Sequence, residues 1–128
     1  MSGAASKKIY YCAIARGVVI LCEYTEQKGN NWRNFTQDIL KKTKVGMHMV
    51  EYDACDYLIE REAGDVDTIY LIAVEKGFSK QVGFDMIDKM KSRFESMVQK
   101  EQVKAAKPFG LNPEFQEELK VLHVTRNR

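Results

Sequence analysis

The most chemically reactive side chains in this 128-residue chain are three cysteines and two histidines. Redox, nucleophilic or zinc chemistry would require a reactive thiol beside a partner, or ligands at short spacing. Cys12, Cys22 and Cys55 form no Cys-x-x-Cys pair, and neither His48 nor His123 has a cysteine or histidine at ligand spacing. We therefore expect structural roles for these residues, with the cysteines serving as small, buried hydrophobes that remain free thiols.

The segment EYDACDYLIERE holds a concentration of carboxylates, and paired carboxylates are typical of general acid–base and metal chemistry. Its acids are Glu51, Asp53, Asp56, Glu60 and Glu62. In a strand, acids that alternate with apolar residues usually form the solvated side. The sequence also lacks a phosphate-binding glycine loop, a Gly-x-Ser-x-Gly turn and a zinc-protease helix motif. We expect no catalytic residues, no metal and no cofactor.

The composition is that of one globular domain, with 45% hydrophobic and 30% charged residues. A net charge of +2 is too small to predict binding to nucleic acid. An odd number of cysteines and the lack of a secretion signal favour reduced thiols in a cytosolic setting.

The stretch YYCAIARGVVILCEYTE, residues 10–26, is apolar on both sides of Arg16 and Gly17. A membrane-spanning helix needs about 20 uninterrupted apolar residues, and a signal peptide also needs an unbroken apolar region. Arg16 interrupts both patterns. The β-branched and aromatic residues favour strands, and Gly17 permits the positive φ of a tight turn. The stretch therefore predicts a β-hairpin over roughly residues 8–24.

A helix is predicted after the turn residues KGNN, with Asn30 or Asn31 as its cap. Its apolar positions recur at helical spacing, and they are Trp32, Phe35, Ile39 and Leu40. Three strands then fit MHMVEY, CDYLIERE and TIYLIAVE. The last of them is apolar at nearly every position, which indicates that helices cover both faces of the sheet.

Two further helices complete the chain. The first is predicted over about residues 80–100, where apolar residues recur at steps of three and four. A basic connector, KEQVKAAKPFG, follows it. The second begins at NPEFQEELKVL, where Asn112 is suited to the cap and Pro113 to the first helical position.

Four segments in this order resemble the longin domain, the N-terminal regulatory module of longin-type R-SNARE proteins of the vesicle-associated membrane protein or synaptobrevin-like family. The segments are IYYCAIARGVVILCEYTEQKGN, DYLIE with TIYLIAVE, GFDMIDKMKSRF, and LNPEFQEELK after an Ala-Lys connector. The resemblance covers about residues 8–122, which is nearly the whole chain.

The resemblance implies an α+β, profilin-like longin fold with elements in the order β-β-α-β-β-β-α-α. A five-stranded antiparallel sheet would have one helix on one face and two on the other. We expect a flexible N-terminus over residues 1–7, the longin domain over residues 8–123 and a tail over residues 124–128 that leads toward a SNARE motif.

The family also implies a function. A longin domain of this kind regulates and targets a vesicle-trafficking SNARE without catalysis, by binding its own SNARE motif in cis or by binding trafficking adaptors. Other SNARE proteins are further expected partners, and nucleic acid is not. The expected location is the cytoplasmic face of endosomal, vesicular or plasma membranes, reached through C-terminal segments that the chain lacks.

The family's binding groove lies between its first helix and third strand. Carried over to this sequence, the groove residues are Trp32, Phe35 and Ile39 of the helix and Met47 and Met49 of the strand. Methionine suits a surface that accepts several partners. The alternative is that all five residues simply pack in the core.

A second reading keeps the fold but changes the role. The chain would then be a free-standing longin-fold scaffold subunit of an adaptor, tethering or GTPase-regulating complex. Because the chain ends at HVTRNR without sustained heptads or a membrane span, both readings fit it. We favour a segment of a longer SNARE, since longin domains of SNAREs normally continue beyond this point.

Overall fold

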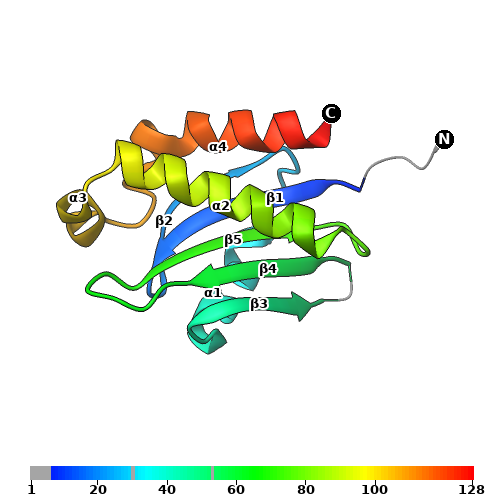
Figure 1. The fold of residues 1–128 in the computed structure, drawn as a ribbon, viewed down its shortest axis with the longest axis horizontal. Coiled ribbons are helices and arrows are strands. Elements are labelled where there is room, and N and C mark those ends of the chain that lie inside the picture. The colour runs from blue at the N-terminus through cyan, green and yellow to red at the C-terminus, as the bar shows by residue number, and fades with distance from the viewer. Residues whose placement is uncertain (1–6, 30, 53) are drawn as a thin grey trace.

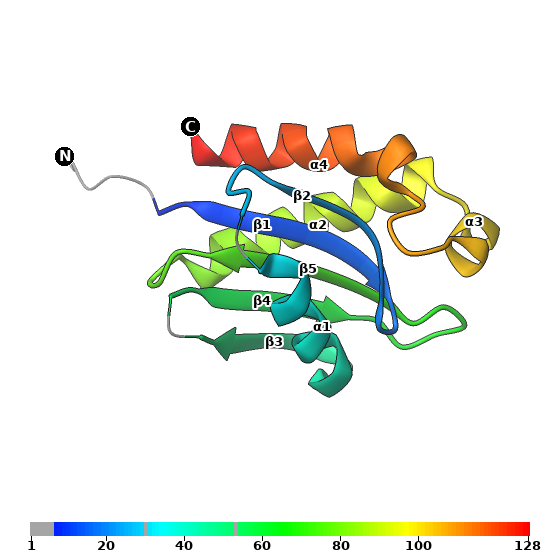
Figure 2. The same cartoon turned by 180° about the vertical axis from the view of Figure 1, so that it is seen from behind.

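A five-stranded antiparallel sheet forms the centre of the molecule, with the strand order β2-β1-β5-β4-β3. The computed structural model describes residues 7–29, 31–52 and 54–128. Its elements are β1 (Ile9–Arg16), β2 (Val19–Thr25), α1 (Trp32–Lys42), β3 (Gly46–Glu51), β4 (Asp56–Arg61), β5 (Thr68–Val74), α2 (Lys80–Met97), α3 (Lys100–Ala105) and α4 (Asn112–Asn127). α2 and α4 cover one face of the sheet, and α1 crosses the other (Figures 1 and 2). The predicted α+β architecture is confirmed.

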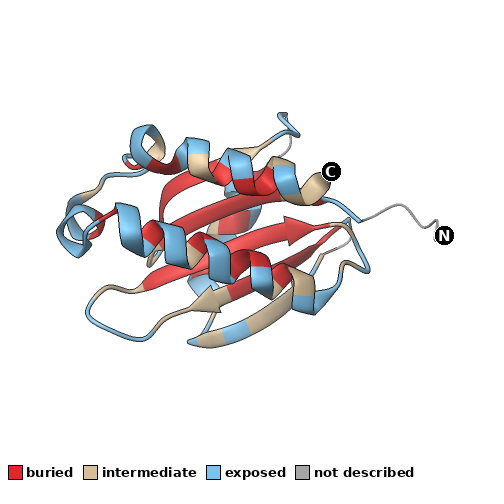
Figure 3. Cartoon of the chain, turned by 45° about the horizontal axis from the view of Figure 1, so that its top comes forward, coloured by how far each residue is buried: buried red, intermediate tan, exposed pale blue. Residues whose placement is uncertain are grey.

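The strand β5 lies in the middle of the sheet, and all seven of its residues are buried. Tyr70 and Ile72 point into the core beneath α2 and α4, whereas Ile69 and Leu71 point into the core beneath α1. Figure 3 shows the corresponding buried stripes on the inner sides of α2 and α4. The nearly continuous apolarity of this strand therefore has the predicted cause.

The sheet joins two local units. β1 and β2 form the predicted hairpin, in which Gly17 has a φ of 56° at the turn. β3, β4 and β5 form an antiparallel meander. β1 also pairs with β5, from Ile9 opposite Val74 to Arg16 opposite Thr68, and this pairing unites the two units.

α2 packs against β4 with little space between them. A Cβ atom built on Gly83 would lie 2.1 Å from Cδ1 of Leu58. Leu58 is itself buried between the sheet and the helix. Glycine at this position therefore sets the distance between α2 and the sheet.

The outer edge of β2 is covered by the segment that leads into α4. The backbone amides of Phe109 and Leu111 donate hydrogen bonds to β2 carbonyls at 2.8 and 3.0 Å. Asn112 accepts one from the amide of Glu23 at 3.0 Å. Asn112 is the first residue of α4, and Leu111 occupies the cap position. The prediction that Asn112 caps this helix is wrong, because its side chain bonds to the sheet instead.

The ends of the remaining helices differ in detail from the prediction. α2 ends at Met97, and the connector contains the short helix α3, which begins with a capping box between Gln99 and Gln102. Asn31 occupies the cap position of α1 but makes no side-chain capping hydrogen bond. The alternative cap Asn30, the acid Asp53 and residues 1–6 lie outside the described residues.

Hydrogen bonds join the two ends of the described chain, and we call this contact the clasp. The side-chain amide of Asn127 accepts a hydrogen bond from the backbone amide of Ile9 and donates one to its carbonyl, both at 2.8 Å. Residues 124–127, which were expected to form a tail, continue α4. Both ends therefore lie at the same side of the molecule (Figure 1).

Candidate protein-binding surface

The five residues expected to line one groove lie on two faces of the sheet. Trp32, Phe35 and Ile39 belong to α1, and only Phe35 among them is exposed, at 44%. Met49 packs against the core beneath α2 and α4. Met47 is 60% exposed on the edge strand β3.

The register between β3 and β4 explains this division. Met49 is paired with Leu58, which lies beneath α2, and Met47 is paired with Glu60. Glu60 accepts a hydrogen bond from Lys91 of α2 at 3.4 Å. Because paired residues share a face of the sheet, both methionines lie on the α2 side. The expectation that they line a groove with α1 is therefore wrong.

The residues that β3 and its neighbours place on the α1 side are others. Val50 and Tyr52 pack against the core beneath α1, and His48 is paired with Ile59 of that core. Tyr10 of β1 also packs there. The segment MHMVEY has apolar residues at both odd and even positions, so alternation alone could not show which set faces α1.

An aromatic pocket of about 370 Å³ opens beside the N-terminal half of α1. We define it by Tyr10, Trp32, Phe35 and Tyr52, which line it together with Gln27, Ala54 and Cys55. The ring centroids of Tyr10 and Trp32 are 6.0 Å apart, and those of Phe35 and Tyr52 are 5.8 Å apart. Three different parts of the fold therefore converge on this pocket.

Two polar contacts fix α1 on the sheet beside the pocket. Arg33 Nε donates a hydrogen bond to Oε2 of the buried Glu23 at 2.6 Å, and its guanidinium lies 3.9 Å from the ring centroid of Phe109. One turn later, the hydroxyls of Thr36 and Tyr57 are 3.3 Å apart within the core. The helix therefore presents its outer side chains from a fixed position.

The surface around α1 and β3 carries much of the exposed apolar area. The large apolar side chains that are exposed in the described part of the chain are Val18, Phe35, Val45, Met47, Met97 and Val121. Phe35 lies in α1, Val45 lies between α1 and β3, and Met47 lies in β3 on the α2 side. β3 is an edge strand, and unlike the edge of β2 no described segment covers it. We define the α1–β3 surface as Phe35, Val45, the aromatic pocket and the open edge of β3.

Three of the five acids of EYDACDYLIERE, namely Asp56, Glu60 and Glu62, form ion pairs. Lys91 contacts Glu60 at 3.4 Å and Glu62 at 2.7 Å, and Lys76 contacts Asp56 at 3.0 Å. In the part of the chain that the structure describes, no group of three or more His, Cys, Asp or Glu side chains is placed to hold a metal ion. These carboxylates tie β4 to its neighbours.

The three cysteines are free and buried, as expected of small core residues. Burial raises the pKa of Cys22 to about 12 and the pKa of Cys12 still further. For Cys55, too, burial raises the pKa above its usual value. A thiol with a raised pKa is a poor nucleophile at neutral pH, so their environment suits packing.

His123 is a core residue of α4. It has no exposed surface, and its Nδ1 lies 3.8 Å from Sγ of Cys12. Its Nε2 makes no hydrogen bond in the described structure and lies 3.6 Å from Oε1 of Glu26. Burial lowers the pKa of His123, although Glu26 opposes this effect. The imidazole is therefore neutral in the folded protein at pH 7.

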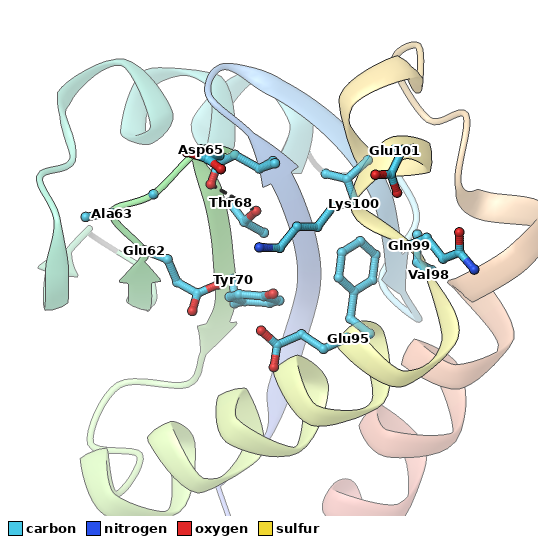
Figure 4. A pocket seen from close by; sticks show the side chains of 14 residues that line it. Glu62, Ala63, Asp65, Thr68, Tyr70, Glu95, Val98, Gln99, Lys100 and Glu101 are labelled. Carbon is cyan, nitrogen blue, oxygen red and sulfur yellow. Dashed lines mark hydrogen bonds between the residues drawn. The ribbon is translucent and has the colours of Figure 1, made fainter.

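A second pocket, of about 470 Å³, lies on the opposite face between α2, α3 and the β4–β5 loop. Figure 4 shows Tyr70 at its centre, with Lys100 extending toward it and Glu62 and Glu95 nearby. The rim of this pocket is thus largely charged. The aromatic pocket offers a more apolar lining, so the α1–β3 surface is the better candidate for contacts with apolar residues of a partner.

Comparison with known proteins identifies the family. The longin family model, described as a Regulated-SNARE-like domain, matches residues 21–119. Vesicle-associated membrane protein 7B of Dictyostelium discoideum is 30% identical over 114 residues, which are 89% of this chain and 43% of that protein. Putative vesicle-associated membrane protein 726 of Arabidopsis thaliana is 29% identical over 89% of this chain and 51% of that protein. Vesicle-associated membrane protein 7 of Gallus gallus is 27% identical over 84% and 47%.

The chain spans about half the length of the curated relatives it matches. Within the described residues, none of the helices combines the length and apolarity needed to cross a membrane.

Proposed function

Because the chain belongs to the longin family, we propose that it is the regulatory and targeting domain of a vesicle-trafficking R-SNARE. It acts without catalysis, by binding an amphipathic segment on the α1–β3 surface. That segment is the SNARE motif of the same protein or a segment of a trafficking adaptor. The relatives are named as vesicle-associated membrane proteins, which supports a location on the cytoplasmic face of vesicle or endosome membranes.

The observation that carries this proposal is the combination of an open sheet edge with exposed apolar side chains. An amphipathic segment binds by placing its apolar side in a hydrophobic groove, and an extended segment binds by pairing with an edge strand. The α1–β3 surface offers apolar contacts at Phe35 and Val45, beside the unpaired edge of β3. The β2 edge offers no such site, because residues 109–112 already bond to it.

The roles proposed for the predicted groove residues differ with their burial. Phe35 contacts the partner directly, and Trp32 forms a wall of the aromatic pocket. Ile39 is 3% exposed and supports α1 from within the core. Met47 lies on the α2 side of β3, so it is left out of the proposed contact surface. Met49 packs beneath α2 and supports the strand.

The test is the substitution Phe35→Ala, measured by calorimetric titration with a peptide that carries an R-SNARE motif. We expect binding to weaken by about tenfold, as for an aromatic residue at the centre of an interface. The matched control is Val121→Ala on α4, because Val121 is exposed to the same degree as Phe35 but lies on the opposite face.

Thermal unfolding of both variants separates binding from folding. Phe35→Ala should lower the melting temperature far less than Ile72→Ala, which leaves a cavity in the core. If Phe35→Ala and Val121→Ala both retain full affinity, the segment binds elsewhere and the proposed surface is wrong.

A further inference from the structure

The aromatic pocket has rigid walls. Trp32 Nε1 donates a hydrogen bond to the carbonyl of Gln27 at 3.2 Å, and the Trp32 ring stacks on Tyr11 with centroids 5.7 Å apart. On the other side, Tyr52 contacts Phe35 and also meets the buried Tyr57 edge-on at 5.5 Å. The rings are therefore positioned before a ligand arrives, which lowers the entropic cost of binding.

One exposed carboxylate of α1, that of Asp38, lies within electrostatic reach of the Tyr52 ring. Asp38 follows Phe35 by one turn of α1, and no described residue forms an ion pair with it. Burial and then the negative charge of Asp38 raise the pKa of Tyr52, so the carboxylate acts on the pocket.

Burial and then the negative charge of Glu75 likewise raise the pKa of Tyr10. The carboxylate of Glu75, however, already has partners. It accepts a hydrogen bond from the amide of Lys8 at 3.0 Å and lies 3.8 Å from Nζ of Lys7. Among the residues that the structure describes, Asp38 is thus a carboxylate within electrostatic reach of the aromatic pocket that forms no ion pair.

We propose that the aromatic pocket receives a basic side chain, arginine or lysine, from the segment that binds the α1–β3 surface. The faces of aromatic rings carry partial negative charge and attract a cation. The methylene stem of arginine or lysine would cover the rings while its charged group approaches Asp38 and the tyrosine hydroxyls. A purely apolar side chain would fill the space but would gain nothing from the ring faces or from the charge of Asp38.

This inference rests on the proposed function for the source of the basic side chain, but the pocket can be tested alone. The test ligands are butylguanidinium, which mimics arginine, and butylurea, which has a similar planar shape and no charge. Trp32 is the single tryptophan of the chain, so its indole N–H gives one assignable signal in proton–nitrogen NMR spectra. We expect butylguanidinium to shift this signal with an affinity about threefold or more above that of butylurea.

Two substitutions separate the contribution of the Asp38 charge to cation binding from that of the aromatic rings. Asp38→Asn should reduce the preference for the cation and leave the weak binding of butylurea unchanged. Tyr52→Leu keeps an apolar wall but removes a ring, so it should also reduce the preference. The matched control is Asp88→Asn, since Asp88 is an exposed acid on α2 at the opposite face.

The inference is overturned if butylurea binds as well as butylguanidinium, which would make the pocket an apolar anchor site, or if neither ligand shifts Trp32. Neither result affects capture of an R-SNARE-motif peptide through Phe35, so the proposed function would stand. Conversely, a clear preference for butylguanidinium together with normal peptide binding by Phe35→Ala would support the pocket and contradict the proposed surface.

Discussion

His123 shows how one buried side chain makes the stability of this domain depend on pH. In the folded protein burial lowers its pKa, whereas in the unfolded chain the pKa returns to an ordinary value of about 6.5. Below that pH the unfolded chain takes up a proton that the folded protein does not. The contribution to stability is therefore present above about pH 6.5 and is lost as the pH falls.

We expect the free energy of unfolding to fall between pH 7.5 and pH 5.5, measured by urea denaturation. The fall should be smaller for His123→Gln, which removes the titrating group. Equal slopes for His123→Gln and the unchanged protein would show that other groups cause the dependence.

The role of His123 could not be predicted from its position in the sequence. A histidine near the C-terminus without nearby ligands indicates either a surface or a core role. The contacts that place it in the core, with Cys12, Tyr24 and Glu26, come from β1 and the end of β2, about a hundred residues earlier in the chain. By contrast, burial of the cysteines follows from the strands that contain or adjoin them, which the sequence does indicate.

At the level of elements, the distance between α2 and β4 depends on the absence of a side chain at Gly83. We expect Gly83→Ala to destabilise the domain by about 1 kcal/mol or more, because the added methyl group overlaps the buried Leu58. This would reverse the usual effect, since alanine favours a helix by about 1 kcal/mol over glycine.

Ser92→Ala is the control for this substitution, because Ser92 lies on the exposed side of α2. It should leave the melting temperature equal or slightly higher. A Gly83→Ala protein that is as stable as Ser92→Ala would mean that Leu58 adopts another rotamer without cost.

The helices and strands themselves were largely predictable from the sequence. Which residues of an apolar strand point toward α1 and which toward α2 was not. Helical spacing predicted α1 itself but did not separate Trp32 and Ile39, which are buried against the sheet, from the exposed Phe35. In β3, Met49 and Val50 are neighbours and both apolar, and only pairing with β4 decides which of them faces α1. The aromatic pocket was also beyond prediction, because Tyr10 reaches it from β1 and Tyr52 from the segment after β3, each about 20 residues from Trp32 in sequence.

On the scale of the whole molecule, Asn127 links the last turn of α4 to the first residue of β1. We expect Asn127→Ala to cost about 1–2 kcal/mol, because two hydrogen bonds to Ile9 are lost. Asn34→Ala on the exposed side of α1 is the control and should change the free energy of unfolding little.

Hydrogen exchange gives the more specific measurement for this clasp. The amide of Ile9 should exchange faster in Asn127→Ala, while amides of β5 keep their protection. If protection falls equally in β5 and at Ile9, the substitution has lowered global stability and the clasp is not a local link.

The pairing of β1 with β5 also determines when the domain can fold during its synthesis. β1 leaves the ribosome before β5, and its partner strand is complete only when Val74 has been added. In the interval the hairpin of β1 and β2 is apolar on both sides and has an unpaired inner edge. Nascent chains with such edges are prone to aggregate, and this makes the interval the natural point for chaperones to act.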